Sequence, residues 1–126
     1  MLKKYHTQMT EAEIKKLEEY VSGLTVDDLG FTEHAVDRAD YKDITKSDIK
    51  KALARFSIVE YKSYSKEYKR IVIRGKKVRK GMNTVLCIDT DNNLITAWKN
   101  PENNKHSRVN LSKYTDNLRV DLSMVG

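Results

Sequence analysis

A chain of 126 residues, 39% hydrophobic and 33% charged, has the size and composition of one globular domain, which excludes a disordered protein. The formal net charge of +6 favours a polyanionic partner, because the neutralisation of phosphates drives nucleic-acid binding. We find neither an apolar run of about 20 residues that would span a membrane nor a signal peptide, so we expect a cytoplasmic protein with no membrane partner.

Helix signals dominate the first half of the chain. Thr10 and Glu13 form a capping-box pattern, which predicts a helix that ends before Gly23. Thr32 can cap a second helix over roughly 33–40, and Thr45 opens a third. Residues 1–30 are therefore predicted to be a helical extension. The first and third helices each carry an apolar stripe, formed by Ile14, Leu17, Tyr20 and Val21 and by Ile49, Ala52, Leu53 and Phe56.

The second half changes to the period-two pattern of β-strands. The predicted strands are "SIVEYKSYS", "KRIVIRG", "NTVLCIDT" and "LITAWKN", with turns at Lys66-Glu67, "GKKVRKG" and "DTDNN". After Pro101 the chain is polar until Leu111, Tyr114 and Leu118 return a turn or strand to the core. We expect an α+β fold, with N-terminal helices on one face of a roughly four-stranded antiparallel sheet. Residues 1–126 then form a single domain, with a core at 31–114.

His34 and Arg38 lie four residues apart in the predicted second helix, at the edge of its apolar stripe. An arginine binds phosphate oxygens in a fork, and a neighbouring histidine can move a proton near neutral pH. The alternative is structural: His34 bonds a backbone group and Arg38 pairs with a nearby aspartate.

The stretch from Trp98 to Asn110, "WKNPENNKHSRVN", is dense in phosphate ligands and proton carriers. Cleavage of RNA by its own 2′-hydroxyl needs a base, an acid and a cation over the phosphate, and it needs no metal. His34 and His106 could supply the base and the acid. The alternative is a polar surface loop. The candidates that this stretch contributes are Lys99, Lys105, His106, Ser107 and Arg108.

The stretch "KRIVIRGKKVRKG", which contains the strand "KRIVIRG", is rich in lysine and arginine and contains no carboxylate. Alternation along a strand would place Arg70, Val72 and Arg74 on one face, which predicts a basic sheet face that Lys76 and Lys77 extend. A solvated hairpin is the alternative. Trp98 is either a core residue, which we favour, or a base-stacking platform. Cys87 is expected to be a buried structural thiol, and His6 a solvated residue near the terminus.

The stretch "FTEHAVDRADYKDITKSDIKKAL" resembles the His-Ala-x-x-Arg helix, followed by Ile-[Ser/Thr]-x-x-Asp-[Ile/Val]-x-x-Ala-Leu, of small bacterial and phage domains. These domains are related to the RelE-like and BrnT-like toxins in the barnase, colicin and RelE ribonuclease superfamily. The later "LITAWKNPENNKHSRVNLSKY" is similar to the ending of that family. The resemblance implies helices on one face of an antiparallel sheet and metal-independent RNA cleavage on the other. It assigns His34, Arg38 and the pair His106-Ser107 to catalysis.

The expected function is therefore a ribonuclease toxin of a phage or other mobile element that cuts RNA to a 2′,3′-cyclic phosphate. No cofactor or metal is expected. Arg38 would stabilise the transition state together with Arg74 or Lys99. An acidic antitoxin or immunity protein is an expected partner, because a basic toxin surface favours it. The alternative is a non-catalytic module that binds nucleic acid or a host protein through the same basic face.

Overall fold

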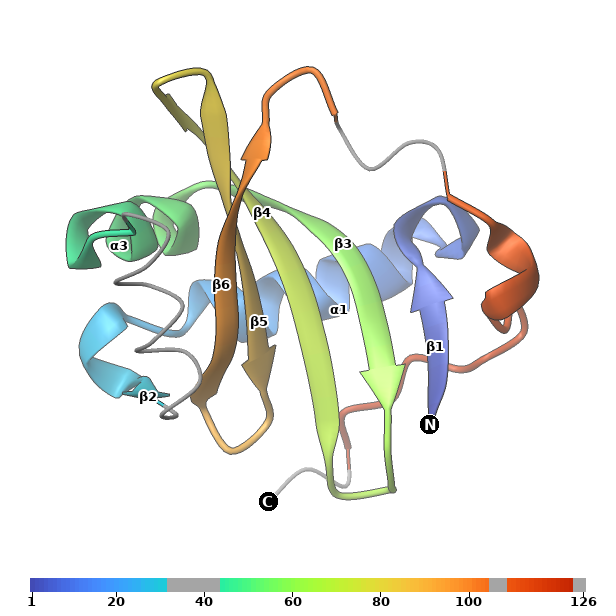
Figure 1. The fold of residues 1–126 in the computed structure, drawn as a ribbon. Coiled ribbons are helices and arrows are strands. Elements are labelled where there is room, and N and C mark those ends of the chain that lie inside the picture. The colour runs from blue at the N-terminus through green and yellow to red at the C-terminus, as the bar shows by residue number, and fades with distance from the viewer. Residues whose placement is uncertain (32–43, 105–108, 124–126) are drawn as a thin grey trace.

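The computed structural model of the chain describes residues 1–31, 44–104 and 109–123. Six strands form one mixed sheet in the order β1-β3-β4-β5-β6-β2 (Figure 1). The strands are β1 (Leu2–Tyr5), β2 (Gly30–Phe31), β3 (Phe56–Ser63), β4 (Lys69–Arg79), β5 (Met82–Asp89) and β6 (Asn93–Pro101). The helices are α1 (Glu11–Ser22) and α3 (Lys46–Ala54), with 3-10 turns η1 (His6–Gln8), η2 (Val26–Asp28) and η3 (Leu111–Lys113). The fold is α+β, as predicted.

Strands β3 to β6 form the predicted antiparallel meander, but the prediction of a roughly four-stranded, wholly antiparallel sheet was wrong. At one edge β1 pairs antiparallel with β3, and at the other β2 pairs parallel with β6. The N-terminal extension is therefore not purely helical. These two strands are four and two residues long, too short to show a periodic pattern. These short strands form because the edges of β3 and β6 offer unpaired backbone groups to them. For example, the backbone N–H of Gly30 donates to the carbonyl of Asn92 at 2.8 Å.

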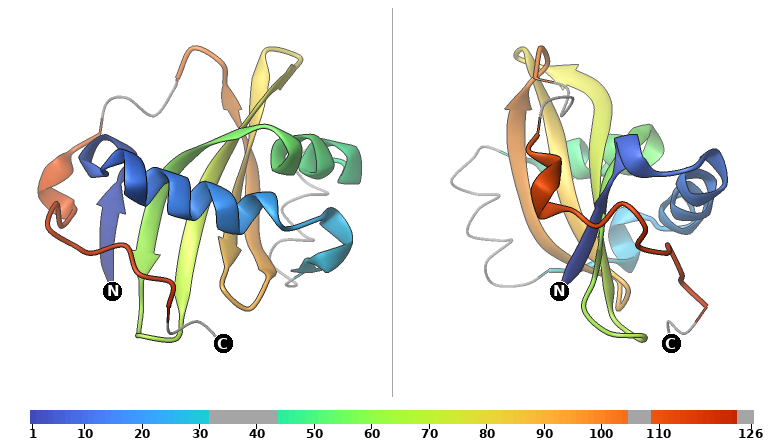
Figure 2. Two further views of the ribbon diagram at one scale, coloured as in Figure 1. Left: turned by 180° about the vertical axis from the view of Figure 1, so that it is seen from behind. Right: turned by 90° about the vertical axis from the view of Figure 1, so that its right-hand side faces the viewer.

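Helices α1 and α3 both lie on one face of the sheet (Figure 2). Each begins at the predicted cap, where the Thr10 and Thr45 hydroxyls accept the backbone N–H groups of Glu13 and Asp48. In their apolar stripes Leu17, Val21, Ile49, Ala52 and Leu53 are buried, and Ile14 and Tyr20 are half-buried. The prediction that Phe56 lies on the third helix was wrong, because α3 ends at Ala54 and Phe56 is the first residue of β3. The main core between these helices and the sheet includes Leu17, Val21, Ile49, Leu53, Ile71, Ile73, Leu86 and Ile88. The predicted second helix over 33–40 lies outside the described residues. Among the described residues, no helix has the length and apolar character that crossing a bilayer requires.

The opposite side of the sheet, which we call the outer face, carries a second, smaller apolar cluster. Its buried members are Tyr5, Val59, Val72, Val85 and Cys87. Tyr114 covers part of this cluster from the C-terminal segment, with its ring centroid 5.2 Å from that of Tyr5. Cys87 is 3% exposed, and burial raises the pKa of its thiol, as suits a structural role. The middle of the predicted basic face is thus apolar.

Strand β4 is longer than predicted, because "GKKVRKG" is mostly strand rather than turn. The hairpin turn is only Lys80-Gly81, between the paired residues Arg79 and Met82. Both turn residues have positive φ, 55° and 73°, which matches the twist of a two-residue hairpin. The pairing of β4 with β5 is interrupted between Arg74 and Val78. The hairpin therefore projects beyond the body of the sheet (Figure 1).

Gly75 lies in this interruption, where β4 passes directly beneath α3. A Cβ atom added there would stand 2.8 Å from the Cβ and 2.9 Å from the Cα of Ala52. Only glycine allows the strand and the helix to approach so closely. This contact fixes where the end of α3 meets β4.

The C-terminal segment returns to the body of the protein, as predicted. After η3, Thr115 donates its backbone N–H to the carbonyl of Lys3 at 2.8 Å. Leu118 then packs against the main core, in which Val120 is buried. Leu111, expected in the core, is instead 42% exposed. The return is therefore made by a short 3-10 turn and an irregular segment.

Candidate nucleic-acid interface

Four exposed cations meet where the end of α3 lies against the projecting part of β4. A hollow of about 250 Å³ is lined by Ala54 and by Lys51, Arg55, Lys76 and Lys77. The backbone N–H of Lys76 donates to the carbonyl of Arg55 at 2.9 Å, which holds the two pairs of cations together. We call these four residues the α3–β4 basic cluster. Among the described residues no carboxylate lines the hollow, and a bound polyanion would relieve the repulsion among its charges.

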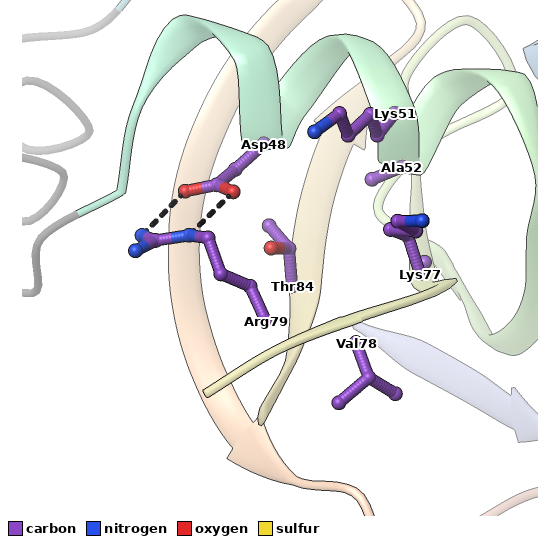
Figure 3. Close-up of a pocket in the computed structure, with 8 residues that line it drawn as sticks. Asp48, Lys51, Ala52, Lys77, Val78, Arg79 and Thr84 are labelled. Atoms are coloured by element: carbon purple, nitrogen blue, oxygen red, sulfur yellow. Dashed lines mark hydrogen bonds and ion pairs between the residues drawn. The ribbon is translucent and has the colours of Figure 1, made fainter. Parts of the chain in front are cut away.

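Beside the cluster is a smaller pocket of about 80 Å³, organised around the buried carboxylate of Asp48 (Figure 3). Arg79 contacts it through two hydrogen bonds, from Nε to Oδ1 at 3.0 Å and from a terminal nitrogen to Oδ2 at 2.9 Å. Lys99 Nζ lies 3.2 Å from Oδ2. Burial alone raises the pKa of Asp48, but the bonds from Arg79, Thr45 and Lys99 outweigh it and lower the pKa well below its ordinary value. Asp48 is therefore a structural anion rather than a proton carrier.

Lys51 and Lys77 line both the Asp48 pocket and the cluster hollow. The Asp48 carboxylate is engaged by Arg79 and Lys99, so it does not neutralise the cluster. The positive potential of the cluster consequently remains available at the surface.

Arg74 lies on the outer face near the end of the sheet that bears the cluster, and it is 7% exposed. Its guanidinium donates to the Asn83 side-chain oxygen at 2.8 Å, to the Pro101 carbonyl at 2.7 Å and to the Asn104 carbonyl. These acceptors are neutral, so they orient the guanidinium without cancelling its charge. Burial lowers the pKa of Arg74. The ordinary pKa of an arginine side chain is far above neutrality.

Arg70 is at the opposite end of the outer face, in an aromatic setting. Its guanidinium carbon lies 4.6 Å from the ring centroid of Tyr64 and 5.4 Å from that of Tyr68. Nε of Arg70 donates to the Tyr68 hydroxyl at 3.1 Å, which itself donates to Asp89 Oδ2 at 2.9 Å. Tyr64 is 42% exposed. This end of the face offers a stacked cation and an accessible ring, the kind of surface on which a nucleobase can stack.

The structure separates the predicted RNA-binding residues into three groups. Arg70, Arg74 and Trp98 share the outer face, where half-buried Trp98 packs against the apolar cluster. Lys76 and Lys77 belong to the α3–β4 basic cluster at the end of the sheet. Lys99 lies on the helix side, bound to Asp48 and donating to the Thr84 hydroxyl at 2.9 Å. They do not form one continuous basic face.

The other predicted site residues lie outside the described part of the chain. These are His34 and Arg38 and, from the later segment, Lys105, His106, Ser107 and Arg108. Asn104 is the last described residue before the gap at 105–108, and its carbonyl accepts a hydrogen bond from Arg74.

Sequence reasoning missed Lys51 and Arg55 as members of a basic surface. The available signal was their spacing of four residues near the expected end of the helix. In the structure Lys51 lies on α3, whereas Arg55 is the extended residue that follows the last residue of α3. Nothing local could pair them with Lys76 and Lys77, which follow more than 20 residues later.

Comparison with known proteins identifies one family. No curated protein and no solved structure matches the chain. A family model described as "Domain of unknown function (DUF4258)" matches residues 31–99, more than half of the chain. The matched range runs from the end of β2 into β6 and contains the whole α3–β4 basic cluster. The chain is therefore a member of the DUF4258 domain family.

Proposed function

We propose that this protein binds RNA through the α3–β4 basic cluster and cleaves it without a metal ion. The observation that carries the proposal is the cluster itself, where four exposed cations line a hollow of about 250 Å³ to which the described residues contribute no carboxylate. Such a site suits a phosphate backbone, because each phosphate–cation contact releases counterions from the nucleic acid. The net charge of +6 acts in the same direction.

The cleavage step rests on the resemblance to the RelE-like and BrnT-like toxins. One of His34 and His106 takes the proton of the 2′-hydroxyl, and the 2′-oxygen attacks phosphorus. The bond from phosphorus to the 5′-oxygen breaks, and the other histidine donates a proton to that oxygen. The products are a 2′,3′-cyclic phosphate and a 5′-hydroxyl. Arg38 stabilises the charge of the transition state, and Ser107 accompanies His106 in the late motif of the family.

A second cation over the phosphate is better supplied by Arg74 than by Lys99. Lys99 lies on the helix side of the sheet, where it neutralises Asp48. Arg74 lies on the outer face and is oriented by neutral acceptors. A toxin of this kind would be encoded by a phage or other mobile element. Its antitoxin or immunity protein would be acidic and would cover the cluster.

Binding without cleavage is the second candidate function, and the same cluster favours it. The four cations need no histidine to hold a polyanion. A binding module would leave RNA intact and cells healthy, whereas a ribonuclease toxin would arrest growth.

The test is induction in bacteria of the wild type beside His34→Ala, His106→Ala and the exposed control Lys113→Ala, followed by electrophoresis of total RNA. We expect growth arrest and discrete fragments with the wild type and Lys113→Ala, and neither with the histidine variants. Purified protein should cut RNA equally well in EDTA. Intact RNA in every strain would refute cleavage and favour the binding module. Cleavage that survives both histidine substitutions would refute the catalytic assignment.

A further inference from the structure

A second hollow, of about 440 Å³, opens at the end of the outer face near the β4–β5 hairpin. The proposed function uses Arg74 and Lys76 of its walls, but it gives no role to His6, Ser57 or Asn83. We call this hollow the His6 pocket. Its polar side chains come from three separate segments, η1, β3 and the neighbouring strands β4 and β5. They are His6, Ser57, Arg74, Lys76 and Asn83.

His6 is held in one orientation rather than being freely solvated as predicted. Its Nδ1 lies 3.0 Å from the carbonyl oxygen of Val59, and its ring centroid lies 4.4 Å from that of Tyr5. A carbonyl oxygen only accepts hydrogen bonds, so Nδ1 must carry the hydrogen. Nε2 is then the ring nitrogen that remains for a ligand. When the imidazole is protonated, Nε2 also becomes a donor.

Arg74 and Asn83 form a rigid wall of the pocket. Asn83 accepts a hydrogen bond from Arg74 through Oδ1 and donates from Nδ2 to the carbonyl of Gly75 at 2.8 Å. These bonds fix a buried positive charge beside the hollow. Exposed Lys76 lines the hollow and adds a mobile charge that can approach a ligand.

We propose that the His6 pocket binds a phosphate group, and that in the functional complex this phosphate is a phosphodiester of the bound RNA. When the ring of His6 is protonated, its Nε2–H, the ammonium of Lys76 and the hydroxyl of Ser57 are donors of the kind that bind phosphate oxygens, and Arg74 supplies fixed positive potential. The volume suits a nucleotide-sized ligand. Lys76 also belongs to the α3–β4 basic cluster, so an RNA strand could pass from one hollow to the other.

The identity of the ligand as RNA rests on the proposed function, whereas the binding of phosphate does not. The family match begins at residue 31, so His6 comes from outside the matched segment, while the other polar residues of the pocket lie within it. The N-terminal extension thus completes a pocket whose remaining walls belong to the family domain.

The test is NMR of the His6 imidazole during titration with inorganic phosphate and with a 2′-O-methyl RNA decamer. The blocked 2′-oxygen prevents cleavage, so binding is measured by itself. We expect both probes to shift the His6 ring signals. In isothermal titration calorimetry, which needs no His6 signal, His6→Gln and Lys76→Gln should each weaken phosphate binding on the order of 10-fold, as loss of a charge-assisted hydrogen bond predicts. Lys66→Gln is the matched control, because exposed Lys66 lines neither this pocket nor the hollow of the α3–β4 basic cluster.

Phosphate that leaves the His6 signals unchanged would overturn the proposal, as would an equal loss of affinity in Lys76→Gln and Lys66→Gln. Because Lys76 is exposed, its substitution remains a valid test if His6→Gln fails to fold. A decamer that shifts the His6 signals while the wild type leaves RNA uncut would support the pocket and refute the ribonuclease. RNA cleavage by a protein whose His6 signals never respond would refute the pocket alone.

Discussion

Neutralising part of the α3–β4 basic cluster should change how steeply RNA binding depends on salt. We consider the triple variant Lys51→Gln, Arg55→Gln and Lys77→Gln, which keeps Lys76 and so leaves the His6 pocket complete. Each phosphate contact to a single strand contributes a slope of about 0.7 to the plot of log affinity against log salt. Three contacts therefore contribute about 2.1. Between 50 and 200 mM salt the wild type should lose about 20-fold more affinity than the variant.

The assay is fluorescence anisotropy with the 2′-O-methyl RNA decamer at several salt concentrations. The control variant Lys15→Gln, Lys66→Gln and Lys113→Gln removes the same total charge from exposed positions outside the cluster. It should retain the wild-type slope. Equal slopes for the two variants would refute the reasoning, because binding would then follow the net charge of the protein rather than this cluster.

Two stability predictions concern the base of the cluster. Asp48→Asn should lower the free energy of unfolding at pH 7 by about 2–3 kcal/mol, less than the roughly 3–5 typical of a fully buried pair because Arg79 is 33% exposed. The pKa of Asp48 is lowered in the folded state, so the stability difference between wild type and Asp48→Asn should be full above about pH 4 and decrease below it. Urea titrations that show this difference growing below pH 4 would contradict the role of Asp48 as a buried, paired anion. Gly75→Ala should cost about 1–3 kcal/mol, because the added Cβ meets Ala52; an unchanged melting temperature would show that α3 can move aside.

The helices and the meander were predictable because their signals are local. Thr10 and Thr45 mark the starts of α1 and α3, and stripes such as Leu17–Val21 identify the buried sides. The strands β3 to β6 are long enough to show alternation. The short strands β1 and β2 were missed, since they are defined by the edges with which they pair rather than by their own residues.

The candidate site was predictable only as a list of residue types. The basic run that contains Arg70, Arg74, Lys76 and Lys77 was recognised, but alternation placed Arg70 and Arg74 together on one basic sheet face. In the folded protein Val72 joins an apolar cluster between them, and Lys99 faces Asp48 on the other side of the sheet. Which charges remain accessible depends on contacts between strands and helices, and those contacts have no signature in a single segment.

The α+β class, the capped helices and the excess of positive charge can all be deduced from the sequence, because each depends on neighbouring residues or on composition. Where that charge is concentrated depends instead on tertiary contacts. A backbone hydrogen bond joins Lys76 of β4 to Arg55, the residue between α3 and β3. The carbonyl of Val59, 53 residues away in the chain, orients the ring of His6. These contacts link segments that are distant in the chain, so they exist only once packing of the main core has brought α3, the sheet and the N-terminal strand together.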